Sequence, residues 1–167
     1  MYSPHQMVPS LPGEPFASTY DGKEFEKSGK ETWDLTDQQK EFLEMDMVRH
    51  VLVLKLEDVD TAVKWNNEMQ KFAEMQPYGS PINFSSDPRH GAGAGTEFKG
   101  NGCKVSRWPD GLGLGATFSQ EICKRFGEVA VEEYRALGIT TALSPQVDLG
   151  TEPRWMRVED RYVERAS

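Results

Sequence analysis

The sequence predicts an α/β protein with parallel strands, and three features of the pattern lead to this. Short apolar segments rich in β-branched residues alternate with longer segments whose apolar residues recur every three or four positions. The order along the chain is strand, helix, strand, a long glycine-rich segment, helix and strand. Strands that alternate with helices are joined by right-handed crossovers and pair in parallel. The pattern alone is compatible with an open doubly wound sheet and with part of a barrel.

The first elements are a helix at 34–47, with Thr36 as its cap, and a strand at 50–56. The strand is apolar and rich in valine, as is typical of a strand buried on both faces. A second helix is predicted at 58–75, ended by Pro77 and Gly79. Its apolar residues share one face: Ala62, Trp65, Met69, Phe72 and Ala73.

The later elements flank a long glycine-rich segment. A second strand is predicted at 82–84, and eight glycines between 85 and 118 predict a long connection without regular structure. A helix at 119–137 begins at Ser119 and ends before Gly138, and a third strand follows at 140–144. The apolar face of that helix comprises Ile122, Phe126, Val129, Ala130, Tyr134 and Leu137.

Composition limits the domain count and the class of partner. The 167 residues fit one domain, and the four prolines and three glycines of residues 1–32 predict an extended or disordered arm before a domain at 33–167.

A net charge of −8 argues against nucleic-acid binding, which needs basic surface. The longest apolar run is too short to cross a bilayer, so no membrane partner is predicted. The N-terminus lacks the pattern of a signal peptide, and the compartment stays unknown.

Residue patterns give no prediction of a metal or cofactor. His90 and Asp87 are only a pair, whereas a metal site needs several converging ligands. The glycines at 111–115 do not follow a strand directly, as a dinucleotide-binding fingerprint requires. We interpret Cys103 and Cys123 as ordinary thiols, with a single disulfide between them as the alternative. The polar helix faces carry acids that we interpret as solvated: Glu68, Glu74, Glu128, Glu132 and Glu133.

Asp87 and Asp148 stand apart because each follows the C-terminal end of a predicted strand. Ligands of parallel α/β folds collect at that edge of the sheet. The alternative interpretation is that both acids only cap local backbone, and position alone leaves the two interpretations open.

Four ordered segments make the sequence similar to glycoside hydrolase family 3, over about residues 48–157. The segment at 82–91 resembles a family segment in which a strand ends in Asp, followed three residues later by His-Gly. The segment at 108–118 resembles Phe-Pro-x-x-x-Gly-Leu-Ala-Ala-Thr-Phe. The segment at 132–139 is similar to Glu-x-Arg-Ala-x-Gly-Ile, and 144–157 resembles Ala-Pro-x-x-Asp-x-x-x-Asp-Pro-Arg-Trp-Gly-Arg.

The resemblance implies a fold and roles for single residues. The domain at 33–167 would be the N-terminal part of a (β/α)₈ barrel of the TIM type, roughly its first three strands and their helices. Asp87 would hydrogen-bond hydroxyls of a terminal sugar, and Arg157 would line the same subsite, so we expect the two to approach each other. His90 and Arg154 would support loops.

The match departs from the family pattern near its end. Met156 replaces the glycine before Arg157, and Glu152 stands where the family motif has Asp. The residues at 158–167 match the run that continues the family motif poorly.

The resemblance also implies a retaining β-glucosidase or exo-glycosidase that hydrolyses terminal β-linked sugars. Such enzymes use two carboxylates, one as nucleophile and one as acid/base. The Ser-Asp-Trp motif that carries the family's nucleophile does not occur in the 167 residues, and neither does its Lys-His pair. No catalytic residue is therefore predicted here, and we expect the chain alone to be inactive.

A different class of function remains open, namely a non-catalytic carbohydrate-binding or scaffold module derived from the same fold. Coding sequence with Ser-Asp-Trp beyond Ser167 would favour the enzyme, and a natural stop codon there would favour the module. The partners implied are a carbohydrate substrate and either the C-terminal part of the enzyme or a second copy. Relatives in the family are often periplasmic or secreted.

Overall fold

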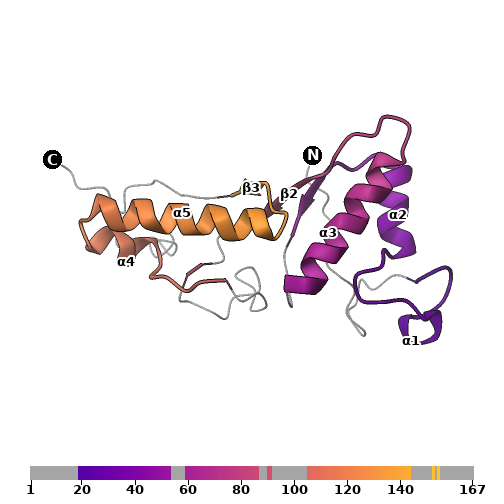
Figure 1. Ribbon diagram of the computed structural model, residues 1–167, viewed down its shortest axis with the longest axis horizontal. Coiled ribbons are helices and arrows are strands. Elements are labelled where there is room, and N and C mark those ends of the chain that lie inside the picture. The colour runs from indigo at the N-terminus through magenta and orange to yellow at the C-terminus, as the bar shows by residue number, and fades with distance from the viewer. Residues whose placement is uncertain are drawn as a thin grey trace.

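The computed structural model describes residues 19–53, 59–86, 90–91 and 105–143, together with Glu152 and Arg154. Within these ranges the chain forms five helices and one three-stranded sheet. Helices α2 and α3 lie side by side at one end of the molecule, while α5 runs out from the sheet toward the other end, with α4 beside it (Figure 1). No helix in the described ranges combines the length and the apolar character needed to span a membrane.

The sheet confirms the predicted parallel α/β arrangement. Strands β1 (His50–Leu52), β2 (Asn83–Ser86) and β3 (Thr141–Ala142) pair in the order β1-β2-β3, and both pairs are parallel. The first predicted strand is longer than β1, but its residues 54–56 lie outside the described residues. Strand β2 extends past its predicted end at Phe84, because Ser85 and Ser86 pair with β3. A barrel is compatible with this sheet and stays a prediction.

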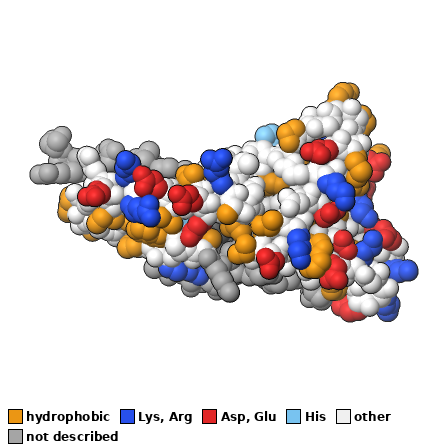
Figure 2. Space-filling model, viewed as in Figure 1, with side chains coloured by type: hydrophobic (Ala, Val, Ile, Leu, Met, Phe, Trp, Pro, Cys, Tyr) orange, Lys and Arg blue, Asp and Glu red, His pale blue; other side chains and the backbone are white. Residues whose placement is uncertain are grey.

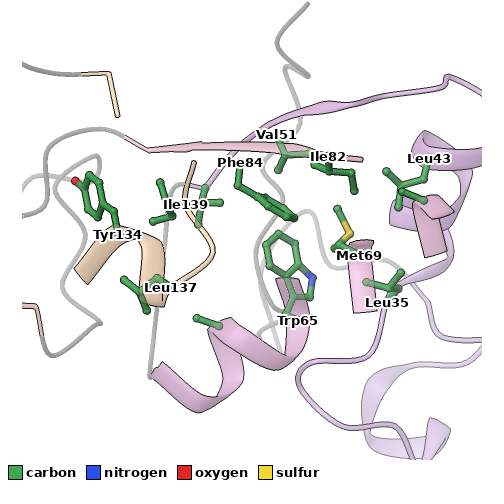
Figure 3. Packing of buried hydrophobic residues seen from close by; sticks show 13 residues of the cluster. Leu35, Leu43, Val51, Trp65, Met69, Ile82, Phe84, Tyr134, Leu137 and Ile139 are labelled. Carbon is green, nitrogen blue, oxygen red and sulfur yellow. The ribbon is translucent and has the colours of Figure 1, made fainter. Parts of the chain in front are cut away.

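The core forms where α3 (Val59–Glu74) packs against the sheet. Four of the five residues of its predicted apolar face are fully buried, and the fifth, Phe72, packs against the core. Figure 3 shows Phe84 pointing from β2 toward Trp65 of α3, with ring centroids 5.8 Å apart. Met69 and Leu43 extend the same cluster toward α2. The helical period of the sequence therefore predicted this side of the core correctly.

Helix α2 (Asp37–Glu44) begins at the predicted cap. The Thr36 side chain accepts a hydrogen bond from the backbone N–H of Gln39, and the Gln39 side chain accepts one from the backbone N–H of Thr36. This capping box satisfies two N–H groups that a helix start otherwise leaves without partners. The helix ends earlier than predicted, and Met47 adopts a left-handed conformation with φ of 52°.

Helix α5 (Gln120–Ala136) begins at Ser119 and ends before Gly138, both as predicted. Its predicted apolar face reaches the core only at the C-terminal end, where Tyr134 and Leu137 are buried. Ile122 is 41% exposed, and Figure 2 shows apolar side chains on the surface at the end of the molecule that α4 and α5 form. The reason is that α5 is longer than the sheet it packs on, so its first turns extend past the sheet (Figure 1).

Two expectations about irregular segments need correction. The glycine-rich segment contains a short helix, α4 (Gly111–Ala116), in which Leu114 is buried and Leu112 is exposed. Residues 19–32 of the predicted arm are folded: Tyr20 is buried, and α1 (Phe25–Ser28) follows a tight turn. The Asp37 carboxylate holds this segment by accepting from the Thr19 hydroxyl and from the N–H of Asp21 and Gly22. The domain boundary at residue 33 stays a prediction.

Candidate functional site

Only two of the four predicted site residues fall within the described part of the chain. His90 and Arg154 are described, whereas Asp87 and Arg157, and also Asp148, lie outside the described residues. The predicted approach of Asp87 to Arg157 is therefore not tested. What the structure does place is the end of the strand that leads to Asp87.

That strand end is fixed by side-chain hydrogen bonds to the neighbouring strand. The hydroxyl of Ser85 donates to the carbonyl of Val51, and the hydroxyl of Ser86 donates to the carbonyl of Val53. Both serines are buried, so these hydrogen bonds form away from water, where an unpaired hydroxyl would be costly. Strand β2 is thus held in register up to the residue before Asp87.

His90 is almost fully buried against α5. Its Nε2 lies 2.7 Å from Oε2 of Glu133, and its ring lies 4.9 Å from that of Tyr134 and 6.0 Å from that of Phe126. Burial lowers the pKa of His90, outweighing the hydrogen bond and the charge of Glu133, which act in the opposite direction. Neutral His90 therefore donates its Nε2–H to the Glu133 carboxylate.

Glu133 is not the solvated acid that the helix pattern predicted. In addition to His90, its carboxylate accepts from the backbone N–H of Ser106, at 3.1 and 3.0 Å to the two oxygens, and from the Ser106 hydroxyl at 3.0 Å. Three donors from two distant parts of the chain therefore converge on one carboxylate. A signal for this was present, since Glu133 stands at the glutamate of the Glu-x-Arg-Ala-x-Gly-Ile motif.

Residues 90–91 and 105–108, which flank the glycine-rich part of the connection, lie together on α5. The backbone N–H of Trp108 donates to the carbonyl of His90 at 2.7 Å, and Gly91 and Trp108 form a parallel bridge. The indole N–H of Trp108 donates to the Ser106 hydroxyl at 2.9 Å, and its ring packs 5.6 Å from Phe126. The backbone of Gly91 approaches the Asp110 carboxylate so closely that a Cβ there would collide with it.

Arg154 makes a local ion pair. Its guanidinium donates to both carboxylate oxygens of Glu152, at 2.7 and 2.9 Å, and these hydrogen bonds lower the pKa of Glu152 to about 2. The Arg154 side chain is 87% exposed, so solvent screens the pair. The structure thus brings His90 together with Glu133 and Ser106, and Arg154 together with Glu152.

Within the described ranges, no three His, Cys, Asp or Glu side chains converge as ligands for a metal ion. Cys123 is a free, half-buried thiol, and Cys103 lies outside the described residues. The chemistry that the described residues support is therefore hydrogen bonding and loop positioning.

The chain is similar in sequence to proteins named as beta-glucosidases. The chain is 43% identical over 99 residues to a periplasmic beta-glucosidase/beta-xylosidase of Dickeya chrysanthemi, an alignment that covers 59% of this chain and 15% of the relative. It is 38% identical over 127 residues to a probable beta-glucosidase C of Aspergillus flavus, covering 74% and 20%. It is 45% identical over 104 residues to beta-glucosidase C of Emericella nidulans, covering 60% and 16%. The matched region thus spans a fifth or less of each of these relatives.

The match to a protein family covers most of the chain. Residues 23–166 match the family described as the glycosyl hydrolase family 3 N terminal domain. This range includes all four sequence segments on which the resemblance rests, the parallel sheet and the network around Glu133. The chain therefore belongs to glycosyl hydrolase family 3.

Proposed function

We propose that this chain forms one side of the sugar-binding subsite of a retaining β-glucosidase-type hydrolase. Asp87 is the residue that accepts hydrogen bonds from hydroxyls of the terminal sugar, and Arg157 lines the same subsite. His90 and Arg154 support the loops that carry them. The observation that carries the proposal is that the Asp87 segment directly follows β2, a central strand of a parallel sheet, in a chain of family 3.

Physical chemistry favours Asp87 in this role. Loops at the C-terminal edge of parallel strands are where α/β folds bind their ligands. A carboxylate has two oxygens with several lone pairs, so it accepts from two adjacent sugar hydroxyls and fixes the orientation of the ring. The Ser85 and Ser86 side chains hold the end of β2 to the carbonyls of Val51 and Val53, directly before Asp87 in the sequence.

The catalytic carboxylates belong to another part of the family 3 polypeptide in this proposal. A retaining mechanism needs a nucleophile and an acid/base about 5 to 5.5 Å apart. Neither is assigned to these 167 residues, because the Ser-Asp-Trp motif is absent from them. The three parallel strands are then the first strands of a (β/α)₈ barrel, which remaining strands from the same polypeptide or a separate segment complete. The names of the relatives support a β-glucoside or β-xyloside as substrate.

A glucose titration of the isotope-labelled chain, followed by amide NMR shifts, tests the binding role. We expect saturable shifts and a loss of affinity of at least about tenfold in Asp87→Ala, since hydrogen bonds to charged groups contribute about 1.5–3 kcal/mol each. Asp46→Ala is the matched control, because Asp46 is exposed in the connection after α2. Equal glucose affinity in both variants would show that Asp87 does not bind the sugar.

A further inference from the structure

We propose that Glu133 is a positioning residue that holds both ends of the glycine-rich connection, at His90 and Ser106, at one place on α5. By doing so it fixes His90, which lies three residues after Asp87 in the sequence. This inference rests on the proposed function for its consequence in sugar binding. The contact itself rests on described residues alone.

The geometry sets Glu133 apart from the other acids of α5. One carboxylate accepts the imidazole N–H of His90, which follows β2, and both the N–H and the hydroxyl of Ser106, which precedes α4. The partners lie 43 and 27 residues away in the sequence. Closing such a connection costs conformational entropy, and bonds at its two ends offset that cost.

The surroundings make these hydrogen bonds stronger than surface ones. The side chain of Glu133 is 29% exposed and that of His90 only 3%. The rings of Phe126 and Tyr134 pack against the His90 ring, and the Trp108 ring packs on Phe126. A charge-assisted hydrogen bond in such surroundings is stronger than its counterpart in water, and loss of the acceptor would leave a buried donor unpaired.

The preceding residue provides a matched comparison. Glu132 is exposed on the same helix and carries the same charge, so Glu132→Gln reproduces the change in net charge and in helix propensity. The role assigned to Glu133 requires a carboxylate that only accepts. A glutamine at that position would turn one acceptor into an N–H donor facing His90 or Ser106.

The imidazole proton of His90 provides a direct spectroscopic signature. In the wild-type chain, Glu133 keeps the proton on Nε2. In Glu133→Gln one of the two oxygens is replaced by an N–H donor. At the Oε2 position this donor faces Nε2 of His90 and favours the tautomer with its proton on Nδ1, and at the Oε1 position it opposes the backbone N–H of Ser106. The ¹⁵N shifts of labelled histidine distinguish the two tautomers, and His90→Gln assigns the signal among His5, His50 and His90.

The first test compares Glu133→Gln with Glu132→Gln by histidine ¹⁵N NMR and amide hydrogen exchange. We expect amide exchange of Ser106 and Trp108 to be faster by at least about tenfold in Glu133→Gln alone, as the loss of a charge-assisted hydrogen bond implies, and the His90 tautomer to change where the glutamine N–H faces Nε2. Exchange at Ile139, whose N–H bonds to Tyr134, should stay unchanged. Equal spectra and exchange in the two variants would overturn the proposal.

A milder variant keeps the proposal testable if Glu133→Gln fails to fold. Ser106→Ala removes one donor to Glu133 and the acceptor of the Trp108 indole N–H, and leaves His90 paired with Glu133. We expect faster exchange at Trp108 and an unchanged His90 tautomer. Unchanged exchange at Trp108 in this variant would also contradict the role of the network.

Glucose titrations of the same variants separate this proposal from the proposed function. We expect Glu133→Gln to weaken glucose binding by about fivefold or more relative to Glu132→Gln, because a mispositioned loop loses hydrogen bonds to the sugar. Equal glucose affinity in both variants, with amide exchange of Ser106 faster in Glu133→Gln, would refute the positioning role and leave Asp87 as the sugar ligand. A wild-type chain that binds no glucose while its His90–Glu133 contact is intact would instead refute the proposed function.

Discussion

At the scale of single residues, burial of His90 makes the free energy of unfolding depend on pH. The pKa of His90 is lowered from its ordinary value of 6.5, chiefly by burial. Between the lowered pKa of the folded chain and 6.5, the unfolded chain binds more protons, so the free energy of unfolding decreases as the pH falls through this window. Above the window, the contribution of His90 is constant.

Urea unfolding at pH 5 and pH 7.5 checks this pH dependence. We expect the wild-type chain to lose more stability on acidification than His90→Gln, because glutamine has no proton to bind in this range. His50→Gln is the control, since His50 is exposed at the start of β1. The same pH dependence in the wild-type chain and in both variants would show that His90 titrates as it does in water.

The sequence predicted part of this residue network but missed the rest. Similarity to family motifs singled out His90, because the motif is contiguous along the chain. Helical periodicity led to the interpretation of Glu133 as a solvated acid. Periodicity indicates which face of a helix a residue occupies, and it gives no information about partners 27 and 43 residues away. Ser106 was missed for the same reason, since a serine in a glycine-rich segment has no pattern of its own.

At the scale of single elements, a glycine within α5 and a glycine just after it have different surroundings. Gly138 terminates the helix with φ of 78°, and a Cβ there would lie 2.8 Å from Nδ2 of Asn66, which donates to the carbonyl of Leu137. Gly127 lies within the helix with open space around it. The same substitution should therefore have opposite effects at the two positions.

Thermal or urea unfolding of two glycine variants tests this difference. Gly138→Ala should lower the free energy of unfolding by about 1–2 kcal/mol, the cost of a left-handed conformation for a residue with a Cβ. Gly127→Ala should raise it by about 0.5–1 kcal/mol, since alanine loses less entropy in a helix. Destabilisation of equal size in both variants would argue against the described end of α5.

The start of α2 allows a separate test of its cap. Thr36→Ala should lower the free energy of unfolding by about 1 kcal/mol, because the N–H of Gln39 loses its acceptor. Thr36→Ser keeps the hydroxyl and should be close to the wild-type chain. Chemical denaturation of the two variants measures the difference, and equal losses would indicate that the methyl group of Thr36 matters instead of its hydroxyl.

Elements with clear hydrophobic periodicity or capping residues were predicted better than elements that depend on tertiary contacts. The face of α3 and the caps of α2 and α5 follow from local sequence, and the structure confirms them. Helix α4 was missed, because three glycines in six residues oppose a helix on propensity alone, while burial of Leu114 is a tertiary contact. The exposure of the first turns of α5 was not predicted, because the hydrophobic periodicity of a helix does not indicate how far the neighbouring sheet extends.

At the scale of the whole molecule, the described ranges form a parallel sheet of three strands with β2 at its centre. Both connections, from β1 to β2 and from β2 to β3, include a helix, α3 and α5 respectively, as repeated β/α units require. The alternation of elements predicted this topology. Closure into a barrel depends on strands beyond these three, so local pattern does not predict it.

We propose that these 167 residues provide a sugar-binding side of an active site and no catalytic carboxylate pair. Attack on the sugar and protonation of the leaving group both need that pair. The most direct test is release of nitrophenol from a nitrophenyl β-glucoside by the purified 167-residue chain and its Asp87→Ala variant. We expect no hydrolysis above background for either protein. Hydrolysis by the wild-type chain that Asp87→Ala abolishes would contradict this proposal and make Asp87 a catalytic residue.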